Sequence, residues 1–186
     1  MPFAPITAMR SPVLNVTEVS SNKDLPPSCK EILESFIMGQ KFTNVSYAKP
    51  LWKYANNVYS GNKAAFLNFQ NTEQLCVNDL IALGFCLNHQ LKSDHPWWQN
   101  PDLQSLRVII GQLRTLRDRP EYRPYRDIIL DIELRCEQQD LDIIAESLVS
   151  DHDNSLLFEQ YCAHYTVANA SALKAFIASL NPKKGA

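Results

Sequence analysis

Apolar side chains recur every three or four residues along most of the chain after residue 25, with polar residues between them. This is the spacing of an amphipathic α-helix, in which one face packs against the rest of the protein. The strict alternation of apolar and polar residues that would indicate a strand is not found. The pattern predicts an all-α, single-domain helical bundle of about seven helices. The main helical segments are 26–38, 48–60, 63–70, 79–91, 101–118 and about 125–150, followed by a pair of short helices within 154–180.

The predicted helix 79–91 differs from the others because it has no charged residue over 80–87. A helix that is apolar on all sides is buried on all sides, so we expect this one to lie at the centre of the bundle. Asn78 is placed to cap its first turn. Gly61 is expected to end an earlier helix, and Pro101 is expected to begin the following one.

Composition along the chain predicts its organisation. Residues 1–24 contain prolines and polar residues without any period, so we expect a mobile N-terminal arm. Residues 25–186 are expected to form the helical domain, which closes with the helical pair in 154–180. A length of 186 residues is ordinary for one domain with a buried core.

Composition and charge are typical of a soluble globular protein: 45% of residues are hydrophobic, 20% are charged and the net charge is −2. So small a net charge gives no general attraction to nucleic acid or anionic membranes. No apolar run approaches the ~20 residues of a membrane span, and the N-terminus lacks the basic start of a secretory signal. The five cysteines lack metal-ligand spacing and are expected to be free thiols. We therefore expect a cytoplasmic protein.

Several short motifs occur in order over about residues 48–148: PLWKYANNVY, FLNFQ, VN at the entrance of the apolar helix, WWQ, LRTLR and IELRCEQQDL. In this order they resemble the landmarks of a proteobacterial family of unknown function, catalogued as domain of unknown function 2390. The chain departs from that family at Gln74, where the family has glycine, and at Phe85, where the family has tryptophan. The resemblance implies an all-helical fold and implies no activity.

Sequence motifs of enzymes and metal proteins are not found. The chain has no glycine-rich phosphate loop and no zinc-protease or serine-hydrolase motif. Glu159 and His164 are five residues apart, whereas metal sites on helices use a Glu-x-x-His spacing. His89 is expected to interact with the C-terminal end of the apolar helix. We therefore expect no cofactor and no metal, and we favour a role without catalysis.

Charge is unevenly distributed in the second half of the chain. Residues 107–126 contain six arginines and two acidic residues, whereas residues 127–160 contain ten acidic residues and one arginine. One interpretation is that the arginine-rich turn 117–126 binds nucleic acid or another polyanion in a salt-dependent way. The other is that the two segments neutralise each other across a helical turn. The neighbouring acidic residues favour the second interpretation, so nucleic-acid binding is not the expected role.

Helical phase places four of these charges among apolar positions. Arg117 falls inside the apolar stripe of the helix 101–118, and Arg114 lies at its edge. On the next helix, Glu133 and Glu137 fall between two apolar stripes, where neighbouring helices would cover them. Buried charges are costly unless they are paired, so we expect an internal ion-pair network. The alternative is that the two arginines are partly free and bind a small anion or metabolite through bidentate contacts.

Trp97 and Trp98 lie in a predicted turn, where we expect both rings to anchor the turn to the bundle. Trp98 also joins Arg114, Arg117 and the two glutamates as a candidate binding residue. The sequence as a whole favours a protein that binds a protein partner, as an adaptor would. It identifies neither the partner nor the oligomeric state.

Overall fold

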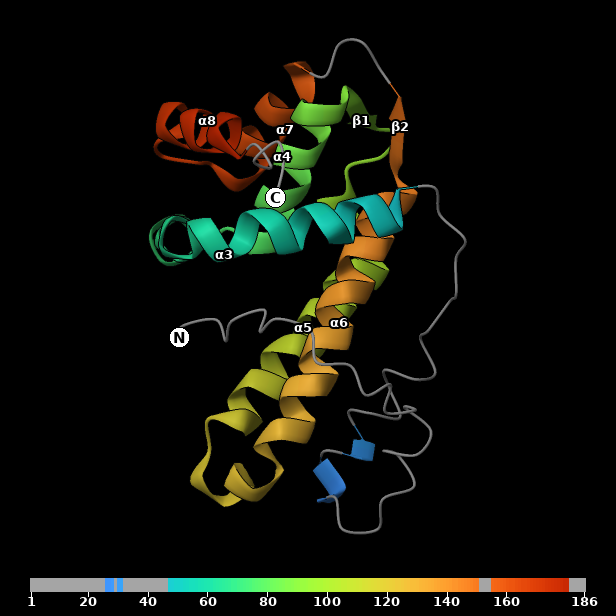
Figure 1. Cartoon of the computed structure of the whole chain (residues 1–186), viewed down its shortest axis with the longest axis vertical. Helices are drawn as coiled ribbons and strands as arrows, with labels where there is room; N and C mark the ends of the chain where they lie inside the picture. The colour runs from blue at the N-terminus through green and yellow to red at the C-terminus, as the bar shows by residue number, and fades with distance from the viewer. Residues whose placement is uncertain (1–25, 29, 32–46, 151–154, 181–186) are drawn as a thin grey trace. The chain divides into compact units, whose positions relative to one another are not determined.

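The structure, a computed structural model, describes residues 26–28, 30, 31, 47–150 and 155–180. It confirms the predicted all-α class, because most of these residues belong to six α-helices (Figure 1). The predicted N-terminal arm, 1–24, and most of the helix predicted over 26–38 lie outside the described residues. The helices are α3 (Ala48–Glu73), α4 (Val77–His89), α5 (Pro101–Arg117), α6 (Arg126–Glu146), α7 (Ser155–Tyr165) and α8 (Ala170–Ser179).

The chain forms two compact units, each with its own buried apolar residues. Helix α6 is continuous: it begins in unit 2, and its last residues, from Leu141, belong to unit 1. Among the described residues, unit 1 contains 47–98, 141–150 and 155–180, and unit 2 contains 26–28, 30, 31 and 99–140.

Helix α3 shows that the predicted helix end at Gly61 is wrong. The helix passes through this residue without a break, so the helices expected over 48–60 and 63–70 are one. A Cβ atom at Gly61 would meet nothing within 4 Å, so no close contact requires glycine there. A glycine inside a helix costs about 1 kcal/mol relative to alanine. The buried face that continues from Tyr59 to Phe66 offsets this cost.

Helix α4 is the buried helix of unit 1, as its apolar sequence predicted. All residues of 79–86 are buried. The helix begins two residues earlier than expected, with Cys76 at the N-cap position, so Asn78 lies inside the first turn and is not the cap. A Cβ atom added at Gly84 would lie 2.7 Å from the hydroxyl oxygen of Tyr54. Glycine at this position therefore allows α3 to approach α4 closely.

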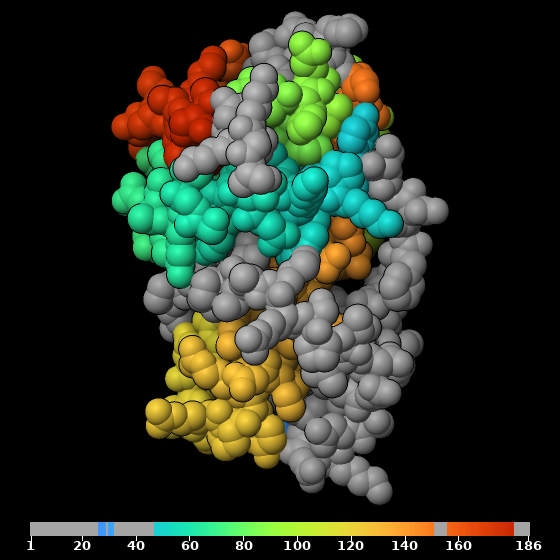
Figure 2. Space-filling view, viewed as in Figure 1, coloured from blue at the N-terminus to red at the C-terminus, as the bar shows by residue number. Residues whose placement is uncertain are grey.

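Leu180, just after α8, joins this helix to α3 and α4. Its carbonyl accepts hydrogen bonds from the Tyr54 hydroxyl and from the Asn88 side-chain amide, the latter at 3.0 Å. Burial raises the pKa of Tyr54 to about 12, so its hydroxyl stays protonated at neutral pH. The ring of Phe176 on α8 also packs against two phenylalanine rings of α3. Figure 2 shows α3 and α8 meeting on one face of unit 1.

A two-stranded antiparallel sheet in unit 1 was not predicted. Strand β1 (Leu91–Ser93) pairs with β2 (Leu148–Ser150), and Lys92 lies opposite Val149. Each strand has only three residues, too few to show an alternating pattern. The helix predicted to reach residue 150 instead ends at Glu146, because the residues after it form the ladder with β1. The sheet thus joins the ends of α4 and α6.

Unit 2 is a hairpin of α5 and the first part of α6, which run side by side (Figure 1). The side-chain oxygen of Asn100 accepts from the backbone N–H groups of Asp102 and Leu103 at 2.9 and 3.2 Å, which caps α5. Pro101 occupies the first helical position, as predicted. The connection is a 3₁₀ helix, η2 (Pro120–Tyr125), whose two prolines prevent α5 from continuing.

Two expectations from composition concern membranes and thiols. No described helix combines the length and apolar character that crossing a bilayer requires. The four cysteines in the described part of the chain are free thiols, as predicted. Burial raises the pKa of Cys86 and of Cys136 to about 12, so both stay protonated and behave as small apolar side chains.

Candidate functional site

The four predicted charged residues meet between α5 and α6 in unit 2. Arg114 Nε donates to Glu133 Oε1 at 2.8 Å, and Arg114 Nη2 donates to Glu137 Oε1 at 2.7 Å. Arg117 Nη1 donates to Glu133 Oε2 at 2.5 Å. Both oxygens of Glu133 therefore accept from a guanidinium group, and Arg114 bridges the two glutamates. The ion-pair network expected from helical phase is confirmed.

The members of this network differ in their access to solvent. The side chains of Arg117 and Glu133 are only 3% and 4% exposed, whereas that of Arg114 is 21% exposed. Arg117 Nε also donates to Asp118 Oδ1 at 3.2 Å, at the solvent-exposed end of α5. Arg117 and Glu133 thus form the enclosed part of the network. Breaking such a pair is strongly destabilising where the charge that remains has no other buried partner.

Glu137 is the member of the network that titrates near neutral pH. Burial raises the pKa of its carboxyl from 4.5 to about 7, although the positive charge of Arg114 opposes this rise. The carboxylates of Glu133 and Asp140 add to the rise. For Arg114 the balance is different: burial lowers its pKa, but the hydrogen bonds and charges of the two glutamates outweigh burial and raise it. The guanidinium therefore remains charged throughout.

A further ion pair in unit 2 was missed by sequence reasoning. Arg107 Nε donates to Asp140 Oδ2 at 2.8 Å and its Nη2 donates to Asp140 Oδ1 at 3.3 Å, and the Asp140 side chain is only 1% exposed. The spacing of these residues along the sequence could have indicated this ion pair. Arg107 lies seven residues before Arg114, and Asp140 lies seven residues after Glu133. The two helices are antiparallel, so a step toward the N-terminus of α5 and a step toward the C-terminus of α6 run in the same direction in space. Seven residues are about two helical turns, which returns each residue to the same face of its helix, so Arg107 and Asp140 face each other.

The remaining arginines of the hairpin lie in or beside its turn. Arg119, Arg123 and Arg126 are exposed. The three arginines of α5, in contrast, are bound to carboxylates of α6. The arginine-rich turn 117–126 therefore presents three exposed cations, whereas Arg117 at its start faces the protein interior.

Trp98 belongs to unit 1, whereas the four charged residues belong to unit 2. Both tryptophan rings are buried, as expected for anchors of the turn. Trp97 Nε1 donates to Asp79 Oδ1 at 2.9 Å, and the Trp98 ring packs edge-to-face on Tyr161 with centroids 5.3 Å apart. The Tyr161 hydroxyl donates to Asp79 Oδ2 at 3.3 Å. Asp79 is a fully buried acid that sequence reasoning did not single out, and it connects α4, α7 and the tryptophan turn.

Two of the described histidines, His89 and His164, pack against aromatic rings. The centroid of His89 lies 4.3 Å from that of Phe85, and the centroid of His164 lies 4.8 Å from that of Tyr165. Within the described part of the chain, no group of three His, Cys, Asp or Glu side chains is arranged to hold a metal ion.

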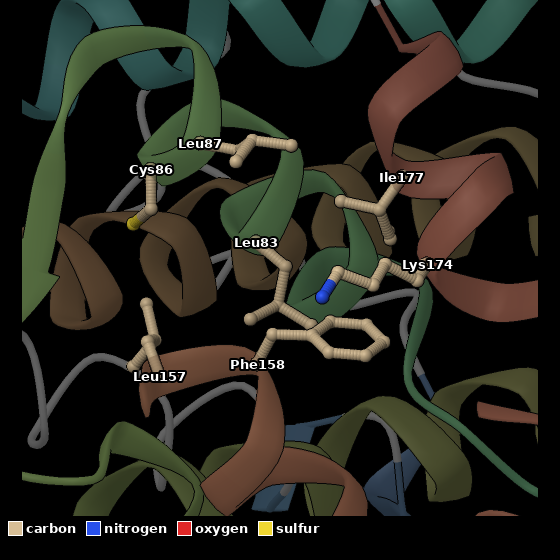
Figure 3. A pocket seen from close by; sticks show the side chains of 7 residues that line it. All are labelled: Leu83, Cys86, Leu87, Leu157, Phe158, Lys174 and Ile177. Carbon is tan, nitrogen blue, oxygen red and sulfur yellow. The ribbon is translucent and has the colours of Figure 1, made fainter. Parts of the chain in front are cut away.

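A small apolar pocket of about 200 Å³ lies between α4, α7 and α8 in unit 1 (Figure 3). Sequence reasoning did not find it, because its walls come from helices about 70 to 90 residues apart in the chain. Its floor consists of four buried side chains: Leu83, Cys86, Leu157 and Ile177. Its more accessible residues are Leu87, Phe158 and Lys174.

Among the described residues, Lys174 is the only charged one that lines this pocket. Its Nζ lies 5.9 Å from the centroid of the Phe158 ring, within range of a cation–π interaction. Figure 3 shows the ammonium group directed toward Phe158 and Leu83. No carboxylate of the described residues lies within ion-pair distance of Lys174. Burial raises the pKa of the Cys162 thiol, and the Lys174 charge opposes that rise. The positive charge of Lys174 therefore also acts on a thiol of α7.

Comparison with known proteins does not add to these observations. No protein-family model, curated protein or solved structure matches the chain. The resemblance to the proteobacterial family therefore stays a prediction.

Proposed function

We propose that the protein is a non-catalytic binding module and that the pocket between α4, α7 and α8 receives a protein partner. One observation carries the proposal: an apolar pocket with a rim residue, Leu87, that is 46% exposed. A large apolar side chain in such a position gains free energy when a partner covers it. Pockets lined by apolar side chains are also where the main anchoring residues of protein interfaces bind. We place this role in the cytoplasm, in keeping with the free thiols.

The alternative of small-anion binding through Arg114 and Arg117 has less support. Both guanidinium groups already donate to carboxylates of α6. An anion would have to displace Glu133 from Arg117 inside the hairpin, and the displaced carboxylate would remain buried without its partner. The polyanion alternative depends on the exposed cations of the 117–126 turn, and the acidic residues that follow weaken their field.

Affinity capture from the native host, with the full chain as bait, tests the proposal. The decisive variant is Leu87→Glu, which places a charge at the pocket rim. Its matched control is Val108→Glu, because Val108 is a 60% exposed apolar residue of α5 that does not line the pocket. We expect a protein that the wild type and Val108→Glu both retain and that Leu87→Glu loses. If all three baits retain the same proteins, the pocket is not the recognition site.

A further inference from the structure

The pocket of unit 1 has a size and a charge that together restrict its occupant. Its volume is about 200 Å³. Pockets for drug-sized ligands and cofactors usually range from about 300 to 1,000 Å³. The space is therefore small for a cofactor and comparable to one large side chain.

The second restriction is the cation at the rim. Lys174 has an aromatic ring and apolar side chains around its ammonium group. An ion pair formed beside such low-dielectric walls is stronger than one formed in open water. The cation–π contact with Phe158 also holds the ammonium at the pocket, so a carboxylate arriving there meets a positioned charge. None of the described residues places an acidic group beside this ammonium, so an acidic group of a partner would complement it.

From these two features we propose that the partner presents an acidic segment, in which one large apolar side chain enters the pocket and a neighbouring Asp or Glu pairs with Lys174. The inference rests on the proposed function and adds the chemistry of the partner to it. The apolar anchor fills the space above Leu83 and Ile177, and the carboxylate supplies the preference for an acidic sequence. Leu87, half exposed at the rim, packs against the stem of the anchor.

Selection from displayed random peptides tests this inference. Peptides of about twelve residues, three helical turns, are selected on the immobilised full chain. We expect the wild type to enrich peptides in which a large apolar residue lies one helical turn or less from Asp or Glu. Selection on Lys174→Glu should instead enrich Lys or Arg beside the apolar residue. Because Lys174 is exposed, this substitution is compatible with folding. Lys53→Glu is the matched control: Lys53 is an exposed lysine of α3 in the same unit, away from the pocket.

The affinity of a synthetic peptide from the wild-type selection gives a quantitative measure. We expect its Kd to rise about tenfold with Lys174→Glu, to change less than about twofold with Lys53→Glu, and to rise with salt. The peptide should also lose affinity for Leu87→Glu, which would connect it to the site of the proposed function.

Three outcomes would overturn the inference. Enriched peptides that need Leu87 but show no charge preference would leave the proposed function standing and remove the role of Lys174. A selection that enriches no sequence would show that a short acidic segment is not the ligand, whatever the capture experiment finds. Saturable binding of octanoate that is lost in Lys174→Glu, without any enriched peptide, would assign the pocket to small amphipathic anions.

Discussion

The two carboxylate oxygens of Glu133 accept hydrogen bonds from different arginines. If Glu133 is removed, Arg114 still has Glu137, whereas Arg117 retains only Asp118 at the exposed end of the helix. If Arg117 is removed, Glu133 still has Arg114. Arg117 and Glu133 are therefore not equivalent. Removal of Glu133 leaves the charge of Arg117 less compensated than removal of Arg117 leaves the charge of Glu133.

This asymmetry gives a prediction for the stability of the hairpin. Glu133→Ala should lower the free energy of unfolding by roughly 3–5 kcal/mol, the scale for breaking a buried ion pair. Arg117→Ala should lower it by less, because Arg114 still neutralises Glu133. The double variant should lose less than the sum of the single losses, since neither charge is left unpaired. Urea unfolding followed by circular dichroism measures all three.

The control for this cycle is Arg123→Ala. Arg123 is exposed in the turn, so its loss should cost under about 1 kcal/mol. Strictly additive losses from Arg117→Ala and Glu133→Ala would contradict the pairing seen in the structure.

Glu137 gives a prediction for the pH dependence of stability. Burial raises its folded-state pKa from 4.5 to about 7, so the folded protein binds more protons than the unfolded chain between these two values. The contribution of this group to stability is therefore greatest at low pH and falls as pH rises through the window. The fall should approach about 3 kcal/mol. Urea unfolding at pH 5 and pH 8 measures it.

The variant Glu137→Gln separates this effect from other sources of pH dependence. It retains the shape of the side chain and removes the titrating group. The difference in stability between pH 5 and pH 8 should therefore change by about 2–3 kcal/mol relative to the wild type. Identical pH profiles for the two proteins would show that Glu137 does not titrate in this range.

At the scale of single helices, the sequence predicted most where the signal is local. A charge inside an apolar stripe is visible in helical phase alone, so Arg117 and Glu133 could be recognised before the fold was known. The burial of Asp140 depends on which helix packs on α6, and helical phase by itself does not specify that partner. The three-residue strands were missed because their ladder joins segments far apart in the chain. The passage of α3 through Gly61 was missed because packing overrides a local preference of about 1 kcal/mol.

The C-terminal end of α3 gives a prediction at the same scale. Gln74 has φ 58° and ψ 29°, a left-handed conformation that helix ends usually assign to glycine. Left-handed backbone costs a non-glycine residue roughly 1–2 kcal/mol, and glycine loses about 0.5–1 kcal/mol more conformational entropy on folding. Gln74→Gly should therefore raise the free energy of unfolding by about 0.5–1 kcal/mol.

The control is the same substitution inside a helix. Gln112 is exposed in the middle of α5, where Gln112→Gly should cost about 1 kcal/mol. Thermal unfolding of both variants tests whether glycine stabilises the protein at residue 74 and destabilises it at residue 112. A loss of stability in Gln74→Gly would mean that the hydrogen bond from its side chain to the Asn71 carbonyl outweighs the backbone cost.

At the scale of the whole molecule, the apolar pocket and the ion-pair network belong to different units. The network lies within one hairpin and follows from two adjacent helices, so its main features were predictable. The pocket needs α4 to pack against α7 and α8, which follow it by about 70 residues, and amphipathic patterns do not specify such pairings. The element with the greatest functional interest is therefore the one that sequence reasoning could describe least.

The last prediction concerns the two closing helices. Removing residues 152–186 deletes the hydrogen bonds at Leu180, the Tyr161 contact with Asp79 and the packing of Phe176 on α3. The apolar face of α4 that these helices cover would become exposed, and large exposed apolar patches promote association. We expect the truncated protein to bind a hydrophobic dye, to aggregate on size-exclusion chromatography and to unfold at lower temperature. A truncation after Leu180 retains all three contacts and should behave as the full chain does. If the shorter protein were monomeric with an unchanged melting temperature, α7 and α8 would contribute nothing to the core of unit 1, and the pocket they form with α4 could not be a stable binding site.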